Sequence, residues 1–135
     1  MPQMSPMQPY DEFIETIEDY RLQSREFLAK SRTYLADDDL HQASEKGWGA
    51  AAWMAKAVAT AQGWRYDKHE HFGEVLYLAG QQTGERRLND LRKTANDLHG
   101  NFYQRKRFLH ADVIADSLDE VATLLDLLEP LTERG

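Results

Sequence analysis

The chain has 135 residues and a formal net charge of −7, with 41% hydrophobic and 29% charged residues. These proportions are typical of one globular domain and not of a disordered chain. Because the sequence contains no cysteine, disulfides, thiolate metal sites and cysteine nucleophiles are excluded.

The N-terminal segment has neither the basic start nor the apolar centre of a signal peptide. Residues 1–9 contain three prolines and three methionines, which predicts a flexible leader before a single domain over residues 10–135. The most apolar run, residues 48–55, is too short to span a bilayer. We therefore expect a cytoplasmic protein that is not inserted in a membrane.

Helical periodicity is clear in the first half of the chain. Apolar residues recur at steps of three and four from residue 10 to about residue 36, and Pro9 is suited to open this helix because its missing N–H needs no partner there. One aspartate of residues 37–39 is expected to cap a second, alanine-rich helix over residues 40–62. Small side chains let neighbouring helices approach closely, so this helix is expected at the centre, and its Gly47 and Gly49 predict tight packing.

The second half continues with helices. Gly63 and a short connection over residues 64–71 precede a third, shorter helix that ends near Gly84. A fourth helix is predicted over residues 85–103, then a basic loop, then a last helix capped by Asp112 and ended by Pro130. No alternating strand pattern occurs. The sequence predicts an all-α fold, an up-and-down bundle of four main helices plus a shorter one.

The fourth helix carries two stripes at helical spacing. The apolar stripe is typical of a face turned into a core, and it consists of Leu88, Leu91, Ala95, Leu98 and Phe102. The polar stripe beside it consists of Arg92, Asn96, His99 and Tyr103. Arg92 and His99 share one face and lie ~10 Å apart along the axis. This stripe indicates either a functional site or polar residues that pack at the edge of the core.

Positive charge gathers around the same helix. Residues 85–110 hold seven basic and three acidic residues, a local balance of +4, whereas the rest of the chain sums to −11. A phosphate-bearing partner would dock here. The residues expected to bind such a substrate are Lys93, Arg105, Lys106 and Arg107.

Other site motifs are weak or absent. Asp38 precedes His41 by three residues, the order found in di-metal bundles, but the pattern has no second copy. His69 and His71 could share a metal, yet only Glu70 adds a carboxylate nearby, so capping or exposed histidines are favoured. Phosphate loops, dinucleotide turns and nucleophile elbows do not occur. No metal and no cofactor are predicted.

The polar stripe contains the groups that cleave RNA without a metal. Histidine can move the proton of the 2′-hydroxyl, and arginine can stabilise charge on the phosphate. Within one chain, the separation of Arg92 and His99 is long for action on one phosphate. A two-fold homodimer that packs this helix against its mate would bring two such pairs into one cleft.

Three segments carry a resemblance to a known family. The pair R-KTANDL-H, the run LHGNFYQ and the upstream SEKGWGAAAWMAKAVA resemble the HEPN superfamily, closest to its PaREP-type branch, over residues 20–129. The resemblance implies a homodimeric helical bundle that is a metal-independent ribonuclease or toxin in some members and has no catalysis in others. It also implies a nucleotidyltransferase-type partner protein. His69 would correspond to a histidine before the third helix, with a packing role.

Two hypotheses follow. In the first, the chain is a dimeric, RNA-associated protein and a metal-independent endoribonuclease, with His99 as acid–base group, Arg92 as phosphate stabiliser, and Asn96 and Tyr103 as positioning groups. In the second, it is a non-catalytic helical dimerisation or interaction module. The local positive charge favours the first hypothesis. The overall negative charge favours the second, as does the spacing of Tyr103, which departs from the His-x-Tyr of the toxin branch.

Overall fold

Five α-helices and one short 3₁₀ helix make up the described part of this computed structural model, residues 9–104 and 109–133. They are α1 (Pro9–Ala36), α2 (Leu40–Gln62), α3 (His71–Thr83), α4 (Arg87–Gln104), α5 (Ala111–Leu128) and the 3₁₀ helix η1 (Glu129–Thr132). No strand occurs within these ranges. The predicted all-α fold is therefore confirmed.

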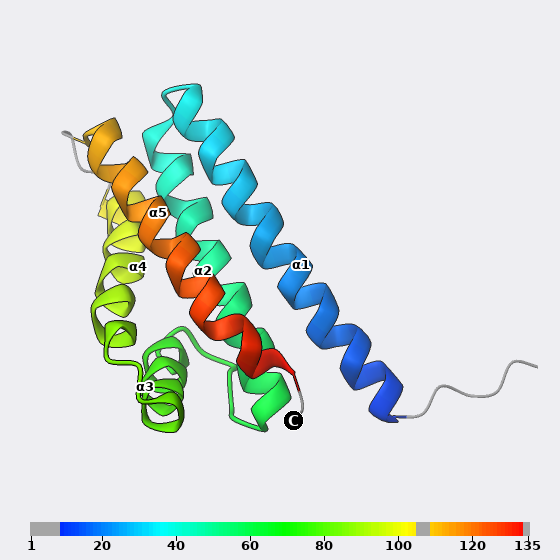
Figure 1. The fold of residues 1–135 in the computed structure, drawn as a ribbon. Helices are drawn as coiled ribbons and strands as arrows, with labels where there is room; N and C mark the ends of the chain where they lie inside the picture. Colours follow the sequence, from blue (N-terminus) through cyan, green and yellow to red (C-terminus); the bar gives the residue numbers. More distant parts are fainter. Residues whose placement is uncertain (1–8, 105–108, 134–135) are drawn as a thin grey trace, which may run out of the picture.

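The long helices run alternately up and down, with α2 in the middle (Figure 1). α1 and α2 form an antiparallel pair, and α4 lies on the other side of α2 from α1. α5 contacts α1, α2 and α4, and the short α3 lies at one end, beside the start of α4. α2 contacts α1, α3, α4, α5 and η1. The central position predicted for the alanine-rich helix is confirmed. None of the described helices is both long and apolar enough to cross a membrane.

Helix ends follow the predicted signals in most places. The Asp39 side chain caps α2 by accepting a hydrogen bond from the N–H of Gln42 at 3.2 Å. Gly63 and Gly84 end α2 and α3 in the left-handed conformation, with φ of 78° and 76°, which glycine adopts without steric cost.

The cap predicted at Asp112 is wrong. α5 begins one residue before it, and His110 occupies the cap position without a side-chain hydrogen bond. The Asp112 carboxylate accepts the N–H of Val113 at 2.9 Å inside the first turn. An acidic residue there stabilises the positive end of the helix whether or not it is the cap, so composition alone did not distinguish the two positions.

Small residues bring α1 against α2, as the sequence predicts. The hydroxyl groups of Ser24 and Ser31, both fully buried, donate to the carbonyl oxygens of Ala50 and Ala43 at 2.6 Å. A Cβ atom on Gly49 would lie 2.5 Å from the Phe27 ring. The close approach of these helices therefore depends on the absence of a side chain at Gly49.

The two stripes of α4 occupy the places that their periodicity implies. Four residues of the apolar stripe are buried in the main core: Leu88, Leu91, Ala95 and Leu98. Three residues of the polar stripe are half-buried at the edge of that core: Arg92, Asn96 and His99. The side chains of Phe102 and Tyr103 lie outside the described residues.

Candidate active site

Two imidazole rings meet over a buried tryptophan where α2, α4 and the loop before α3 converge. His99 comes from α4, His69 from the loop and Trp48 from α2. The ring centroids of His69 and His99 are 4.6 Å apart. The ring centroid of Trp48 lies 4.5 Å from that of His69 and 4.9 Å from that of His99. The three rings form one continuous contact, which we call the histidine pair on Trp48.

A carboxylate holds one of the two imidazoles. The Glu45 Oε2 atom lies 3.2 Å from Nδ1 of His99. Glu45 precedes Trp48 by three residues on α2, so both side chains project from the same face of that helix. A carboxylate accepts a hydrogen bond from a protonated Nδ1 and so fixes the orientation of the imidazole ring.

The site has a rigid floor and an accessible rim. Trp48 is 6% exposed and packs edge-on against the buried Phe72, with ring centroids 4.7 Å apart. His69 is exposed, and the side chains of His99 and Glu45 keep 23% and 29% of their surface in solvent. A substrate can therefore reach both imidazoles, while the aromatic rings beneath keep their orientation.

The two imidazoles differ in their electrostatic surroundings. Partial burial lowers the pKa of His69 below its ordinary value of 6.5, the adjacent His99 lowers it further, and the Glu45 carboxylate raises it. His69 is thus neutral in most molecules at pH 7. A neutral imidazole beside one held by a carboxylate is the arrangement that separates a general base from a general acid.

This difference predicts the titration of His69. Its imidazole signals in NMR spectra should titrate with a midpoint below 6.5. The midpoint should rise towards 6.5 in His99→Gln, which removes a neighbouring positive charge, and fall further in Glu45→Gln, which removes the negative one. A midpoint that stays unchanged in both variants would contradict the electrostatic coupling of this pair.

The other predicted site residues are distributed along α4. Arg92 lies two turns before His99, and its guanidinium donates to the side-chain oxygen of Asn89 at 3.3 Å. Asn96 is half-buried between them, and Lys93 is exposed. The Tyr103 side chain and residues 105–107, which include three of the predicted substrate-binding residues, lie outside the described residues.

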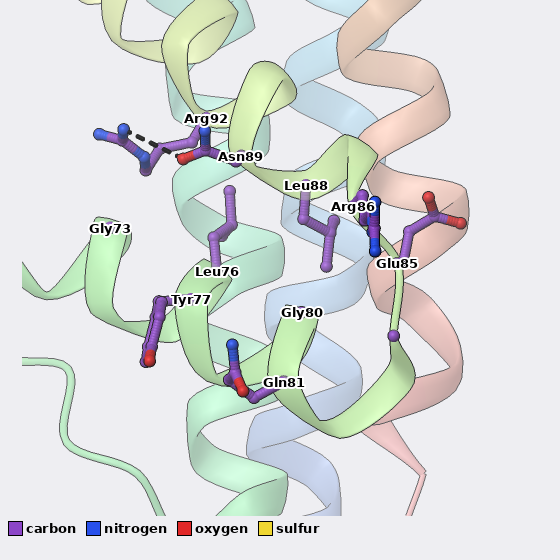
Figure 2. Close-up of a pocket in the computed structure, with 11 residues that line it drawn as sticks. Gly73, Leu76, Tyr77, Gly80, Gln81, Glu85, Arg86, Leu88, Asn89 and Arg92 are labelled. Carbon is purple, nitrogen blue, oxygen red and sulfur yellow. Dashed lines mark hydrogen bonds between the residues drawn. The ribbon is translucent and has the colours of Figure 1, made fainter.

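Arg92 also borders a pocket between α3 and α4, about 730 Å³ in volume. Figure 2 shows Arg92 on one side of the pocket and Arg86, beside Glu85, on the other, with Leu76 and Leu88 between the two arginines. Tyr77 stands at the edge of α3. α4 therefore contributes to two adjacent features, the histidine pair and this pocket.

His69 and His71 do not form a shared metal site. The side chain of His71 is buried, and its Nδ1 accepts the N–H groups of Asp67 and Lys68 at 3.1 and 3.3 Å. These hydrogen bonds connect the loop before α3 to His71, the first residue of α3. Across the described ranges, no three histidine, aspartate or glutamate side chains are placed to hold a metal ion.

Sequence reasoning found His99 but missed its neighbours. Trp48 lies in the alanine-rich helix predicted over residues 40–62, but its type and position indicate only that it is buried. Glu45 lies on the same face, a signal that could have linked the two residues. His69 comes from an aperiodic loop, and only the tertiary structure shows that it contacts His99.

The chain matches a known family in its sequence and a solved structure in its fold. Residues 19–125 match the model of the archaeal PaREP1/PaREP8 family. The chain is similar to the crystal structure of a protein from Sulfolobus solfataricus, with a TM-score of 0.71 and 18% identity over 82% of this chain and 97% of that chain. At this identity the likeness shows the fold alone. The comparison with curated proteins found no match. The predicted PaREP-type resemblance is confirmed, and the chain belongs to the archaeal PaREP1/PaREP8 family.

Proposed function

We propose that this protein is an RNA-associated helical bundle that cleaves RNA without a metal, as some members of the HEPN superfamily that its sequence resembles do, and that the histidine pair on Trp48 performs the reaction. The observation that carries the proposal is the contact between the His69 and His99 rings, 4.6 Å apart, with Glu45 at 3.2 Å from His99. Two accessible imidazoles in different electrostatic surroundings provide an acid and a base in one site.

The proposed reaction is a transphosphorylation within the RNA chain. Neutral His69 takes the proton of a 2′-hydroxyl, whose oxygen attacks the adjacent phosphorus. The bond from phosphorus to the 5′-oxygen breaks, and His99 gives that oxygen a proton. The products are a 2′,3′-cyclic phosphate and a free 5′-hydroxyl. The attacking and leaving oxygens lie on opposite sides of one phosphorus, so the acid and the base must both reach the same phosphate. The contact between His69 and His99 places two imidazoles at one site.

Glu45 and Arg92 have supporting roles in this proposal. Glu45 keeps His99 oriented through Nδ1. Arg92 is ~10 Å from His99 along the helix axis, so within one chain it anchors a phosphate next to the one that reacts. In a two-fold homodimer built on α4, the partner's copy of this helix would add a second arginine near the reacting phosphate.

The decisive experiment is cleavage of a mixed RNA pool by the purified protein in EDTA. We expect products with cyclic phosphate ends. His99→Ala should lower kcat by about 10²–10⁴-fold, the usual contribution of a general acid or base. Arg92→Ala should mainly raise KM, because it removes an anchor for substrate and leaves the imidazoles in place.

A matched control removes a histidine elsewhere. His110 is exposed at the start of α5, so His110→Ala should cleave as the parent does. Light scattering during size-exclusion chromatography would test the dimer and show whether each variant associates as the parent does. Equal cleavage by the parent and His99→Ala would mean a contaminating nuclease. No cleavage by the parent would overturn the proposal and favour a non-catalytic interaction role.

A further inference from the structure

The side of α2 that faces away from α5 is only partly covered by α1. Gly47 faces α5, because a Cβ atom there would lie 2.6 Å from Leu118. Gly49 is two positions later and so points to nearly the opposite side of the helix, where a Cβ atom would lie 2.5 Å from the Phe27 ring of α1. Trp53 continues this side one turn further on and is half-buried, not buried. This side of α2 is therefore within reach of a partner.

Three half-buried aromatic rings and two lysines form a continuous strip there. The ring centroid of Trp53 lies 5.3 Å from that of Tyr20 and 6.3 Å from that of Phe27. The Nζ atom of Lys46 lies 4.6 Å from the centroid of the Phe27 ring. The Nζ atom of Lys56 lies 5.0 Å from the centroid of Tyr20 and 5.4 Å from that of Trp53. We call these five residues the aromatic–lysine strip.

The two lysines of the strip carry charge that no described carboxylate balances. Lys30 on α1 also lies near the Phe27 ring, but it forms an ion pair with Glu26 at 3.6 Å. Neither Lys46 nor Lys56 forms an ion pair with a residue whose side chain the structure describes. In a chain with a net charge of −7, the strip is thus a local surface of positive charge on an apolar base.

The arrangement of the lysines indicates which partner fits. The ammonium groups lie over the faces of the rings, and a nucleic-acid base would need a free ring face on which to stack. The rings are half-buried, whereas aromatic anchors that bind a membrane project into the headgroup region. A carboxylate needs only the outer side of an ammonium group, and aliphatic side chains need only the ring edges between the two lysines. The strip therefore favours an acidic protein segment.

The spacing of the lysines indicates the shape of that segment. Lys46 and Lys56 are ten positions apart on α2, ~15 Å along the helix axis. Carboxylates about three turns apart on a second helix have the same separation, with one apolar face between them.

We propose that the aromatic–lysine strip binds an acidic amphipathic helix of a partner protein. The carboxylates of that helix pair with Lys46 and Lys56, and its apolar side chains pack on Phe27 and Trp53 between them. This is the common mode in which an amphipathic helix presents its apolar face to a receptor. The strip shares no residue with the histidine pair on Trp48, so its role does not depend on RNA cleavage.

The test is NMR titration of the full chain with three matched helical peptides of about 18 residues. The first carries leucines on one face and glutamates about three turns apart beside them. We expect it to shift the indole N–H signal of Trp53 and to leave that of the buried Trp48 in place. A peptide with lysines in place of the glutamates should not bind. A peptide with serines in place of the leucines should bind at least about tenfold more weakly, because its apolar face is lost.

Substitutions in the protein locate the charge contribution. Lys46→Gln and Lys56→Gln should each weaken binding of the glutamate peptide by about 3- to 10-fold. Lys93→Gln is the matched control, because it removes an equal charge from an exposed position on α4, and its effect should be less than about twofold. Equal losses in all three variants would overturn the strip as the binding site in favour of general electrostatic attraction.

The other outcomes would assign the strip to a different occupant or to none. If a short RNA with 2′-methoxy groups, or vesicles of phosphatidylglycerol, shifts the Trp53 signal and displaces the peptide, the proposal of a protein partner is overturned. Movement of that signal on dilution of the protein alone would assign the strip to a second copy of the chain. No binding of the glutamate peptide would also overturn the proposal. His99→Ala should bind this peptide as the parent does even if it cleaves no RNA, which separates this inference from the proposed reaction.

Discussion

Leu118→Ala is expected to lower the free energy of unfolding by about 2–5 kcal/mol, the usual cost of emptying a fully buried leucine site. Leu118 is 0% exposed on α5 and belongs to the main core. Its Cδ2 atom lies 2.6 Å from the position that a Cβ atom on Gly47 would occupy. Leu118 therefore fills the space that Gly47 leaves on α2. When Leu118 is shortened to alanine, Gly47 has no side chain that could fill the resulting cavity.

Chemical denaturation of the parent and the variant would measure this loss, and the two should have the same m-value. A second substitution sharpens the test. Gly47→Ala should destabilise the parent, because its Cβ atom would overlap Leu118 in the core. In Leu118→Ala that overlap disappears, and the alanine gains about 1 kcal/mol of helix propensity over glycine. If the two substitutions add without coupling, the two residues do not share one space.

His69→Gln is expected to lower the rate of RNA cleavage by about 10²–10⁴-fold and to change its dependence on pH. In the parent, kcat/KM should rise with pH as His69 loses its proton, at a midpoint below 6.5. Without His69 the rising limb should disappear, because no imidazole base then titrates in that range.

Rates from pH 4.5 to 9 in parent, His69→Gln and Glu45→Gln would check this expectation. Glu45→Gln keeps both imidazoles, so its profile should keep the rising limb at a lower rate. That limb should move to lower pH because the carboxylate raises the pKa of His69. A rising limb that persists in His69→Gln would show that another group is the base. A rate unchanged in His69→Gln would limit His69 to packing on Trp48.

Most of the fold could be predicted from the sequence because helices, their buried faces and their ends depend on residues that are close together in the chain. The spacing of Leu88, Leu91 and Leu98 requires one buried face of α4, and the structure buries that face. Asp39 begins α2 because its side chain accepts a hydrogen bond at the cap, and Gly63 ends α2 because glycine adopts the left-handed conformation. The cap predicted at Asp112 was wrong because an acidic residue is favourable at several positions in the first turn of a helix, so its presence does not identify the cap.

The candidate site was only partly predictable, since its members come from separate elements. Periodicity placed His99 at the edge of the core and Arg92 on the same face two turns earlier. It did not show that Glu45 on α2 faces His99, because any helix could have packed against that stripe. The contact depends on how closely α2 and α4 approach, which the small residues of α2 permit.

The sequence by itself therefore determined the helices, their ends, their buried faces and the concentration of positive charge around α4. Only the tertiary structure decided which polar groups meet. It brought His69 from a loop without periodicity onto Trp48, and it placed Arg86 and Arg92 at the pocket between α3 and α4. The physical reason is that local patterns act over one or two turns, whereas contacts between side chains far apart in the chain depend on how whole helices pack.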